Sequence, residues 1–219
     1  MPERQIVAMG GYPDDALLGY VLGLARGRRV LCVATATRED PASTLMLYER
    51  FHGRADMTHL EFFPWPPAEL RRLALEQDVI FVTGGNTANA LAIWRTHGFD
   101  RILREAWDEG VVLTGWSAGM ICWFEQAVTD SFGPDLSALD CLGFLPGSAC
   151  PHYDGEELRR PVYTRLVREG LSAGVAADDD VALHYVGDEL REVVTSREGA
   201  TAYRVEPEGE TALEARLVT

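Results

Sequence analysis

One serine of the sequence lies in a pattern that is typical of a catalytic nucleophile. Ser117 is the middle residue of segment 115–119, which reads GWSAG and follows an apolar run. In a G-x-S-x-G elbow, the small residues let the chain turn sharply from a strand into a helix, which presents the serine hydroxyl. The start of that helix supplies N–H groups for a developing oxyanion. The pattern therefore predicts acyl-transfer chemistry at Ser117; a tight turn with an incidental serine is the alternative.

A serine nucleophile needs a base and an acid that orients the base. Of the five histidines, His152 is best placed, because it follows an apolar segment and precedes an expected helix over residues 156–169. Three aspartates, Asp178, Asp179 and Asp180, follow the small apolar segment 174–177. Neighbouring extended residues alternate sides, so an inward Asp179 would leave Asp178 and Asp180 facing water. From the residues alone, the choice among the three acids stays open.

A second glycine-rich turn lies where another apolar segment ends. Residues 84–87 read GGNT and follow the apolar run 79–83. Paired glycines let a backbone approach a ligand closely, so the N–H groups of Gly85 and Ala118 are the candidate oxyanion hole. The plain alternative is a turn in which Asn86 caps the next helix. Because no G-x-G-x-x-G occurs here, a dinucleotide site is not supported.

Composition excludes several other kinds of protein. All 20 basic residues are arginine, which rules out a Walker A loop, a lysine Schiff base and a Ser-Lys dyad. A net charge of -14 disfavours nucleic acid and anionic membrane surfaces as partners. Four cysteines without C-x-x-C spacing predict neither a disulfide framework nor a zinc site. We expect no metal, and the lack of a targeting or membrane-spanning segment predicts a cytoplasmic protein.

The elements that must position these residues alternate along the chain. Apolar runs at 5–9, 30–34, 79–83 and 111–114 are separated by segments with helical character. Strands that are apolar on both faces and alternate with helices predict a parallel sheet covered on both sides. Four short segments near the C-terminus are expected to form an antiparallel edge: 181–185, 189–196, 200–205 and 213–218. With no linker or repeat, residues 1–219 are expected to form a single domain.

Taken together, these motifs resemble the peptidase E family of serine peptidases, family S51. The likeness rests on segments 84–87 and 115–119, on Pro151-His152 and on the acid near Asp179, and it extends over most of the chain. It implies a three-layer α/β/α sandwich with a mostly parallel sheet, similar to class I glutamine amidotransferases. It also implies a Ser-His-Glu type of triad, no cofactor, a small peptide substrate and a homodimer. By position, Ser117 is the nucleophile and His152 the base, and Asp179 stands in place of the glutamate.

The sequence departs from this family after the histidine. In aspartyl dipeptidases, a Gly-Glu-Thr-Arg block carries an arginine that can pair with the substrate aspartate; here segment 155–158 reads GEEL. Leu158 cannot replace that guanidinium, and Arg159 and Arg160 are rotated from it by about 100° per residue on a helix. This change argues against specificity for Asp-X dipeptides. Asn86 and Arg159 are the candidate substrate-binding residues.

Two functions compete at this stage. The first is a serine peptidase that hydrolyses short peptides through a Ser-His-Asp triad. The second is a non-catalytic ligand-binding or sensor protein on the same fold, which the missing arginine favours.

Overall fold

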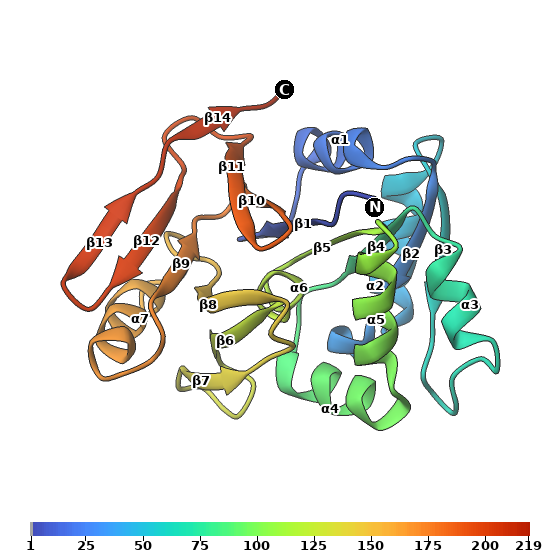
Figure 1. The fold of residues 1–219 in the computed structure, drawn as a ribbon, viewed down its shortest axis with the longest axis horizontal. Coiled ribbons are helices and arrows are strands. Elements are labelled where there is room, and N and C mark those ends of the chain that lie inside the picture. The colour runs from blue at the N-terminus through green and yellow to red at the C-terminus, as the bar shows by residue number, and fades with distance from the viewer. Residues whose placement is uncertain (1) are drawn as a thin grey trace.

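The computed structural model describes residues 2–219 and contains two β-sheets (Figure 1). The larger sheet has the strand order β14-β11-β10-β1-β5-β4-β2-β3, and the smaller one has the order β13-β12-β9-β8-β6-β7. Strands of the larger sheet are β1 (Gln5–Met9), β2 (Arg29–Val33), β3 (Asp56–Leu60), β4 (Val79–Val82), β5 (Val112–Trp116), β10 (Val181–Val186), β11 (Glu189–Thr195) and β14 (Ala215–Leu217). Strands of the smaller sheet are β6 (Phe124–Thr129), β7 (Ser137–Asp140), β8 (Leu145–Cys150), β9 (Gly174–Ala177), β12 (Ala202–Glu206) and β13 (Gly209–Ala212).

Helices cover both faces of the larger sheet, as the alternating pattern predicts. The helices of the chain are α1 (Asp15–Leu24), α2 (Pro41–Phe51), α3 (Leu70–Leu75), α4 (Thr87–His97), α5 (Phe99–Asp108), α6 (Ala118–Ile121), α7 (Arg159–Arg168) and the 3-10 turn η1 (Thr35–Thr37). Of these, α7 packs against the smaller sheet instead. In β1, Val7 and Met9 pack with α1 and α2, whereas Ile6 and Ala8 pack with α3, α4 and α5. Strands β1 to β5 of this sheet pair in parallel. The mixed α/β fold with a large, mostly parallel sheet is thus confirmed.

The smaller sheet was not predicted. One of its faces belongs to the same buried cluster as α3, α4 and α5, and the other packs against α7. Strand β12 was expected at the antiparallel edge of the main sheet, but it pairs with β9 in the smaller sheet. The helix that follows the Ser117 elbow is also short, because α6 ends at Ile121 and β6 already begins at Phe124. Short apolar runs such as β6 and β8 are too brief for periodicity to assign.

The chain passes between the two sheets four times. It leaves the larger sheet after β5 through α6, returns between β9 and β10, leaves again between β11 and β12, and returns between β13 and β14. Ser117 lies in the first of these connections and Asp179 in the second. The residues that the sequence selects therefore gather at the junction of the sheets.

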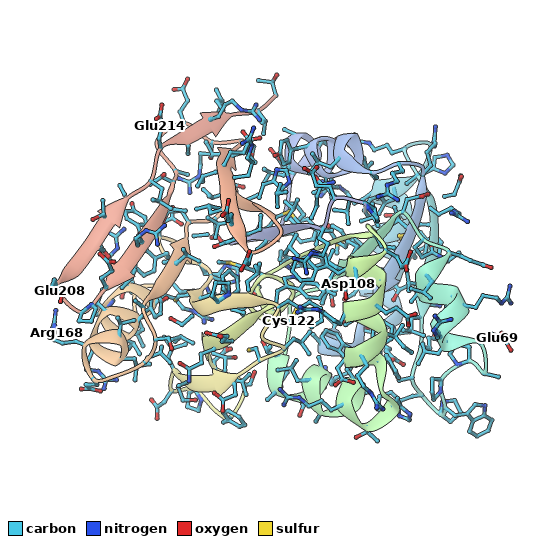
Figure 2. The ribbon with its side chains drawn as sticks, in the orientation of Figure 1. Glu69, Asp108, Cys122, Arg168, Glu208 and Glu214 are labelled. Carbon is cyan, nitrogen blue, oxygen red and sulfur yellow. The ribbon has the colours of Figure 1, made fainter. Side chains whose placement is uncertain are left out.

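Between the sheets the interior is apolar, and charged side chains lie outside it. Cys122 is buried at the centre of Figure 2, whereas the labelled Glu69 and Arg168 lie at the periphery. Cys32, Cys122, Cys141 and Cys150 are buried free thiols. Within residues 2–219, no helix combines the length and apolar character needed to cross a membrane.

Candidate active site

Ser117 occupies a strained turn between β5 and α6. Its φ of 53° lies in the left-handed region, which non-glycine residues rarely adopt and which costs free energy. The glycines on either side are required by packing, because a Cβ at Gly115 or Gly119 would overlap the carbonyl oxygen of Val82. The N–H of Ser117 donates to the carbonyl of Met9 at 3.1 Å. The elbow therefore packs against Val82 of β4 and is hydrogen-bonded to Met9 at the end of β1.

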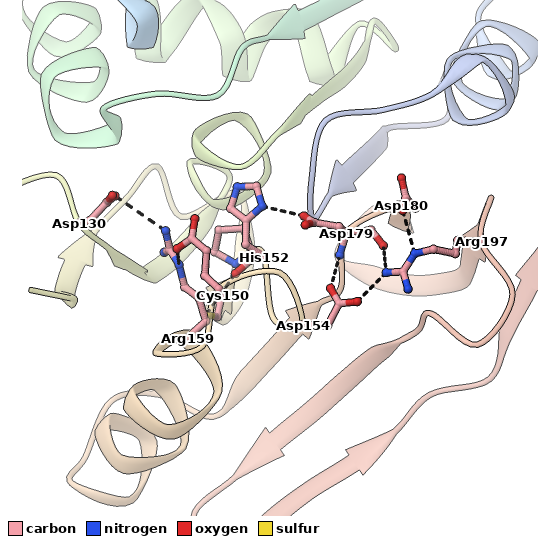
Figure 3. Close-up of polar contacts among 10 residues, drawn as sticks. Asp130, Cys150, His152, Asp154, Arg159, Asp179, Asp180 and Arg197 are labelled. Carbon is pink, nitrogen blue, oxygen red and sulfur yellow. Dashed lines mark hydrogen bonds and ion pairs between the residues drawn. The ribbon is translucent and has the colours of Figure 1, made fainter. Parts of the chain in front are cut away.

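His152 and Asp179 come from neighbouring parallel strands of the smaller sheet. Strands β8 and β9 pair with Cys150 opposite Ala176, so the residues that follow them lie side by side. Nδ1 of His152 donates to Oδ1 of Asp179 at 2.7 Å (Figure 3). Both side chains are partly exposed. This contact leaves Nε2 of His152 as the free ring nitrogen for a substrate or a nucleophile.

The end of β1 joins the two halves of the site. The N–H of His152 donates to the carbonyl of Gly10 at 3.3 Å, next to the Met9 carbonyl that holds Ser117. Ser117 and His152 are therefore fixed to adjacent peptide groups, although they follow strands of different sheets. Within residues 2–219, Oγ of Ser117 makes no hydrogen bond. Such catalytic contacts are often long in an unliganded site and shorten when substrate binds.

Two glycines make room for the carboxyl group of Asp179. A Cβ at Gly11 would overlap its Oδ1, and a Cβ at Gly155 would overlap its Oδ2. Neither glycine has the positive φ that would require glycine for backbone reasons. Close approach of the acid is thus the reason for glycine at these two positions.

One of the other two aspartates, Asp178, does not lie where it was expected. Asp178 is only 3% exposed, and its Oδ2 accepts the N–H of Thr201 at 3.0 Å. This burial raises the pKa of Asp178. Asp180 is partly exposed, and its Oδ2 accepts from Nε of Arg197 at 2.8 Å. The expectation that both face water is wrong for Asp178, since the chain is not regularly extended here: Asp180 has a φ of 63°.

The glycine-rich turn after β4 lies beside the elbow. A Cβ at Gly84 would collide with the indole of Trp116 and lie within 3.3 Å of Cβ of Ser117. Gly85 has a φ of 123° and packs against the carbonyl of Ala36. In the described part of the chain, the N–H groups of Gly85 and Ala118 have no hydrogen-bond acceptor. Both predicted oxyanion donors therefore lack an internal acceptor in residues 2–219, and their role stays a prediction.

The two candidate substrate-binding residues are engaged in contacts within the protein. Oδ1 of Asn86 caps α4 by accepting the N–H of Asn89 at 2.9 Å, and its Nδ2 donates to the carbonyl of Ser131 at 2.8 Å. Arg159 is 3% exposed, and its Nε donates to Glu156 at 2.6 Å. Each side chain has a visible structural role, so their assignment to substrate binding stays a prediction.

A cavity of about 560 Å³ opens next to Gly85, and the sequence analysis did not identify it. Its lining is polar and includes Arg38, Asp40 and Asn89. Arg38 and Glu39 both have positive φ, at 62° and 55°. The Glu39 carboxylate accepts the N–H groups of Phe62 and Phe63, at 2.6 and 3.2 Å. This strained pair turns Glu39 inward and leaves Arg38 at the cavity.

Among residues 2–219, no group of three or more His, Cys, Asp or Glu side chains is arranged to hold a metal ion. The three consecutive aspartates, in particular, have three different partners: a backbone N–H, a histidine and an arginine.

Comparisons with known proteins identify the family of this chain. The sequence profile of peptidase family S51 matches residues 14–193. The chain is 47% identical over 212 residues to the uncharacterized peptidase YgaJ of Bacillus subtilis (strain 168), covering 92% of each chain. It is 30% identical over 134 residues to Peptidase E of Shewanella denitrificans, covering 57% of each. The crystal structure of a peptidase from an acI-B1 Actinobacterium superposes with a TM-score of 0.74 at 16% identity, covering 99% of this chain and 96% of that one. The chain therefore belongs to peptidase family S51 and is a peptidase.

Proposed function

We propose that this peptidase hydrolyses short peptides through a Ser117-His152-Asp179 triad. The observation that carries the proposal is the 2.7 Å contact from His152 to Asp179 beside a strained serine elbow that is fixed to the same strand end. A base oriented by a carboxylate and a serine presented on a tight turn are the parts that serine hydrolysis needs.

The proposed steps follow from these positions. Oγ of Ser117 attacks the substrate carbonyl carbon while Nε2 of His152 takes the hydroxyl proton. The C–N bond then breaks, and His152 returns that proton to the leaving amine. Water, deprotonated by His152, hydrolyses the acyl-enzyme and releases Ser117. Asp179 holds the imidazole in the tautomer with the proton on Nδ1 and stabilises the imidazolium.

The oxyanion of each tetrahedral intermediate is assigned to the N–H groups of Gly85 and Ala118. Both groups are free of internal acceptors in the described chain, and Gly84 packs directly on Ser117. Removing one donor of this kind typically lowers turnover by about 10²–10³. Because both donors are backbone groups, their alignment depends on the glycine turn and the elbow rather than on a side chain.

The cavity next to Gly85 is the place that we assign to the substrate. Its volume of about 560 Å³ lies within the usual range for small-ligand sites. Arg38, Asp40 and Asn89 line it beside Gly85 and offer polar partners to a short peptide. Leu158 is exposed and offers no partner to an aspartate carboxylate, and the net charge of -14 repels an acidic substrate. Weak hydrolysis of Asp-X dipeptides is therefore part of the proposal.

The arginines near Leu158 do not change this expectation. Arg159 is buried against Glu156, and Arg160 lies over the rings of Tyr153 and Tyr203. Arg38, at the cavity, is the cation that could serve an acidic substrate instead. If Asp-X dipeptides are instead cleaved efficiently and Arg38→Met abolishes that activity, the expectation of weak Asp-X cleavage is wrong. Arg38 would then recognise the substrate carboxylate.

A fluorophosphonate probe and a dipeptide library test the proposal together. Wild-type protein should be labelled at Ser117, as peptide mapping would show, and should cleave members of the library. Ser117→Ala should do neither. Absence of labelling in folded wild-type protein would overturn the triad assignment and favour a binding role for this pocket.

The homodimer implied by the family likeness and the cytoplasmic location stay predictions. Light scattering coupled to size-exclusion chromatography tests the first, and a mass near twice 24.2 kDa is expected.

A further inference from the structure

Arg197 connects the two loops that carry the proposed base and acid. It lies between β11 and β12, in the third passage between the sheets. Its Nη2 donates to Oδ2 of Asp154, two residues after His152, and to the carbonyl oxygen of Asp179 at 3.0 Å. Its Nε donates to Asp180 at 2.8 Å (Figure 3). One guanidinium therefore binds three acidic residues of the two loops.

These contacts close a ring around the backbone of Asp179. The N–H of Asp179 donates to Oδ1 of Asp154 at 2.8 Å, while Arg197 binds the other oxygen of that carboxylate. The N–H and C=O of Asp179 are thus held by two side chains that also hold each other. These bonds fix the peptide groups on both sides of the Asp179 side chain, and so they help to set the direction of its carboxyl group.

The backbone of Arg197 is held by the side chain of Thr195. Oγ1 of Thr195 donates to the carbonyl of Arg197 at 2.9 Å and accepts its N–H at 3.2 Å. Thr195 is buried, and its hydroxyl also contacts the carbonyl of Asp180. The guanidinium is therefore presented from a defined backbone rather than from a loose loop.

We propose that Arg197 is a positioning residue that holds Asp179 in the orientation required to align His152. The inference rests on the proposed triad, but it concerns a residue outside it. Within residues 2–219, Arg197 makes no hydrogen bond to the imidazole or to Ser117, and so it acts through the residues that it binds, chiefly Asp179 and Asp154.

The exposure of the Arg197 side chain argues that its ion pairs do not mainly stabilise the fold. The Arg197 side chain is 44% exposed, and exposed pairs contribute little to the free energy of unfolding. Two guanidinium nitrogens in one plane reach two carboxylates and a carbonyl oxygen at once, which the single nitrogen of a lysine could not fully reproduce. Loss of Arg197 should therefore affect the geometry of Asp179 more than the stability of the fold.

The test compares Arg197→Met and Arg197→Lys with Arg216→Met. Arg216 is a matched control, because it is an exposed arginine (56%) paired with a single carboxylate, Glu192. On a dipeptide from the library, Arg197→Met should lower kcat by roughly 10²-fold with KM unchanged, the loss expected for a catalytic group displaced by about 1 Å. Arg197→Lys should recover part of kcat, and Arg216→Met should resemble wild type.

A spectroscopic readout keeps this test independent of the proposed function. The proton shared by His152 Nδ1 and Asp179 should give a strongly deshielded NMR signal in wild type that Asp179→Asn removes. Arg197→Met should weaken or remove this signal while thermal unfolding remains close to wild type. The signal can be followed even if no peptide is cleaved, so failure of the peptidase proposal is distinguishable from failure of this one.

A double-mutant cycle with Asp154→Ala completes the design. Because Arg197 and Asp154 belong to one ring, their effects on kcat should be non-additive. Additive effects, a loss expressed mainly in KM, or an unchanged NMR signal with unchanged kcat in Arg197→Met would each overturn the positioning role.

Discussion

Gly11 lies directly against the carboxyl group of Asp179, and a single added carbon at this glycine would occupy the place of Oδ1. The obstacle is the far end of a side chain rather than backbone, so the acid can move aside at little cost to the fold. Gly11→Ala should therefore lower kcat by about 10-fold to 10²-fold, because Asp179 is displaced from His152. Thermal unfolding should change little.

The matched control for this change is Gly19→Ala. Gly19 lies within α1 with open space around it, and alanine there should stabilise the helix slightly without affecting kcat. Equal activity of Gly11→Ala and wild type would show that the Asp179 carboxyl group has no fixed position.

Asp179→Asn is expected to lower kcat by roughly 10⁴-fold, because the amide cannot hold His152 in the required tautomer. Asp180→Asn should be nearly silent, since an amide oxygen can still accept from Arg197 and the residue does not contact His152. Steady-state kinetics of the two variants, with circular dichroism as a check on folding, measure the difference. If Asp180→Asn lowered kcat more than Asp179→Asn does, Asp180 rather than Asp179 would be the acid of the triad.

Ser117→Ala should abolish hydrolysis and labelling by a fluorophosphonate while the fold is retained. The hydroxyl makes no hydrogen bond within residues 2–219, so its removal leaves no buried group unpaired. Ser172→Ala, at an exposed position after α7, is the control and should keep full activity. Turnover in Ser117→Ala equal to that of wild type would exclude this serine as the nucleophile.

Hydrolysis should survive treatment with EDTA. The carboxylates of segment 178–180 are committed to Thr201, His152 and Arg197, and they do not converge on one point. Rates measured before and after dialysis against the chelator should agree. Lost activity that a divalent metal restores would instead indicate a metallopeptidase.

Mild acid should destabilise the fold through His184, which lies far from the proposed triad. It is buried between Tyr20, at 2.6 Å from Nδ1, and Gln5, at 3.1 Å from Nε2. Burial lowers the pKa of His184 from its ordinary value of 6.5. The unfolded chain therefore binds a proton first, and this contribution to stability is present above pH 6.5 and is lost as the pH falls below it.

Urea unfolding at a series of pH values between 7.5 and 5 measures this effect. One such proton changes the free energy of unfolding by at most about 1.4 kcal/mol per pH unit. The pH dependence should be steeper in wild type than in His184→Gln, which removes the titrating group. Identical slopes for the two proteins would contradict the assignment to His184.

Local pattern was enough to identify several parts of this molecule. The Ser117 elbow and the strands before it are read from adjacent residues, because a buried parallel strand and a glycine turn each have a short-range signature. The placement of Asp179 beside His152 depended on a family likeness, since three consecutive acids look equivalent in a sequence.

Other parts depend on contacts that no local pattern records. Arg197 meets Asp154 and Asp179 across 43 and 18 residues of chain. The smaller sheet is built from short strands that pair only after the chain has crossed between sheets. The hydrogen-bond partner of the buried Asp178 is likewise distant in the sequence: it is Thr201, in the connection between β11 and β12. The periodicity of a sequence does not predict such long-range pairing.

The division of the site between two sheets has a mechanical consequence. His152 and Asp179 follow adjacent strands of the smaller sheet and would move as one body, whereas Ser117 follows a strand of the larger sheet. A small hinge motion of one sheet against the other would part the nucleophile from its base and leave the imidazole–carboxylate pair intact. The shared buried cluster between the sheets and the bond from His152 to the Gly10 carbonyl oppose that separation. The end of β1 therefore holds the nucleophile and the imidazole–carboxylate pair in one place, although they belong to different sheets.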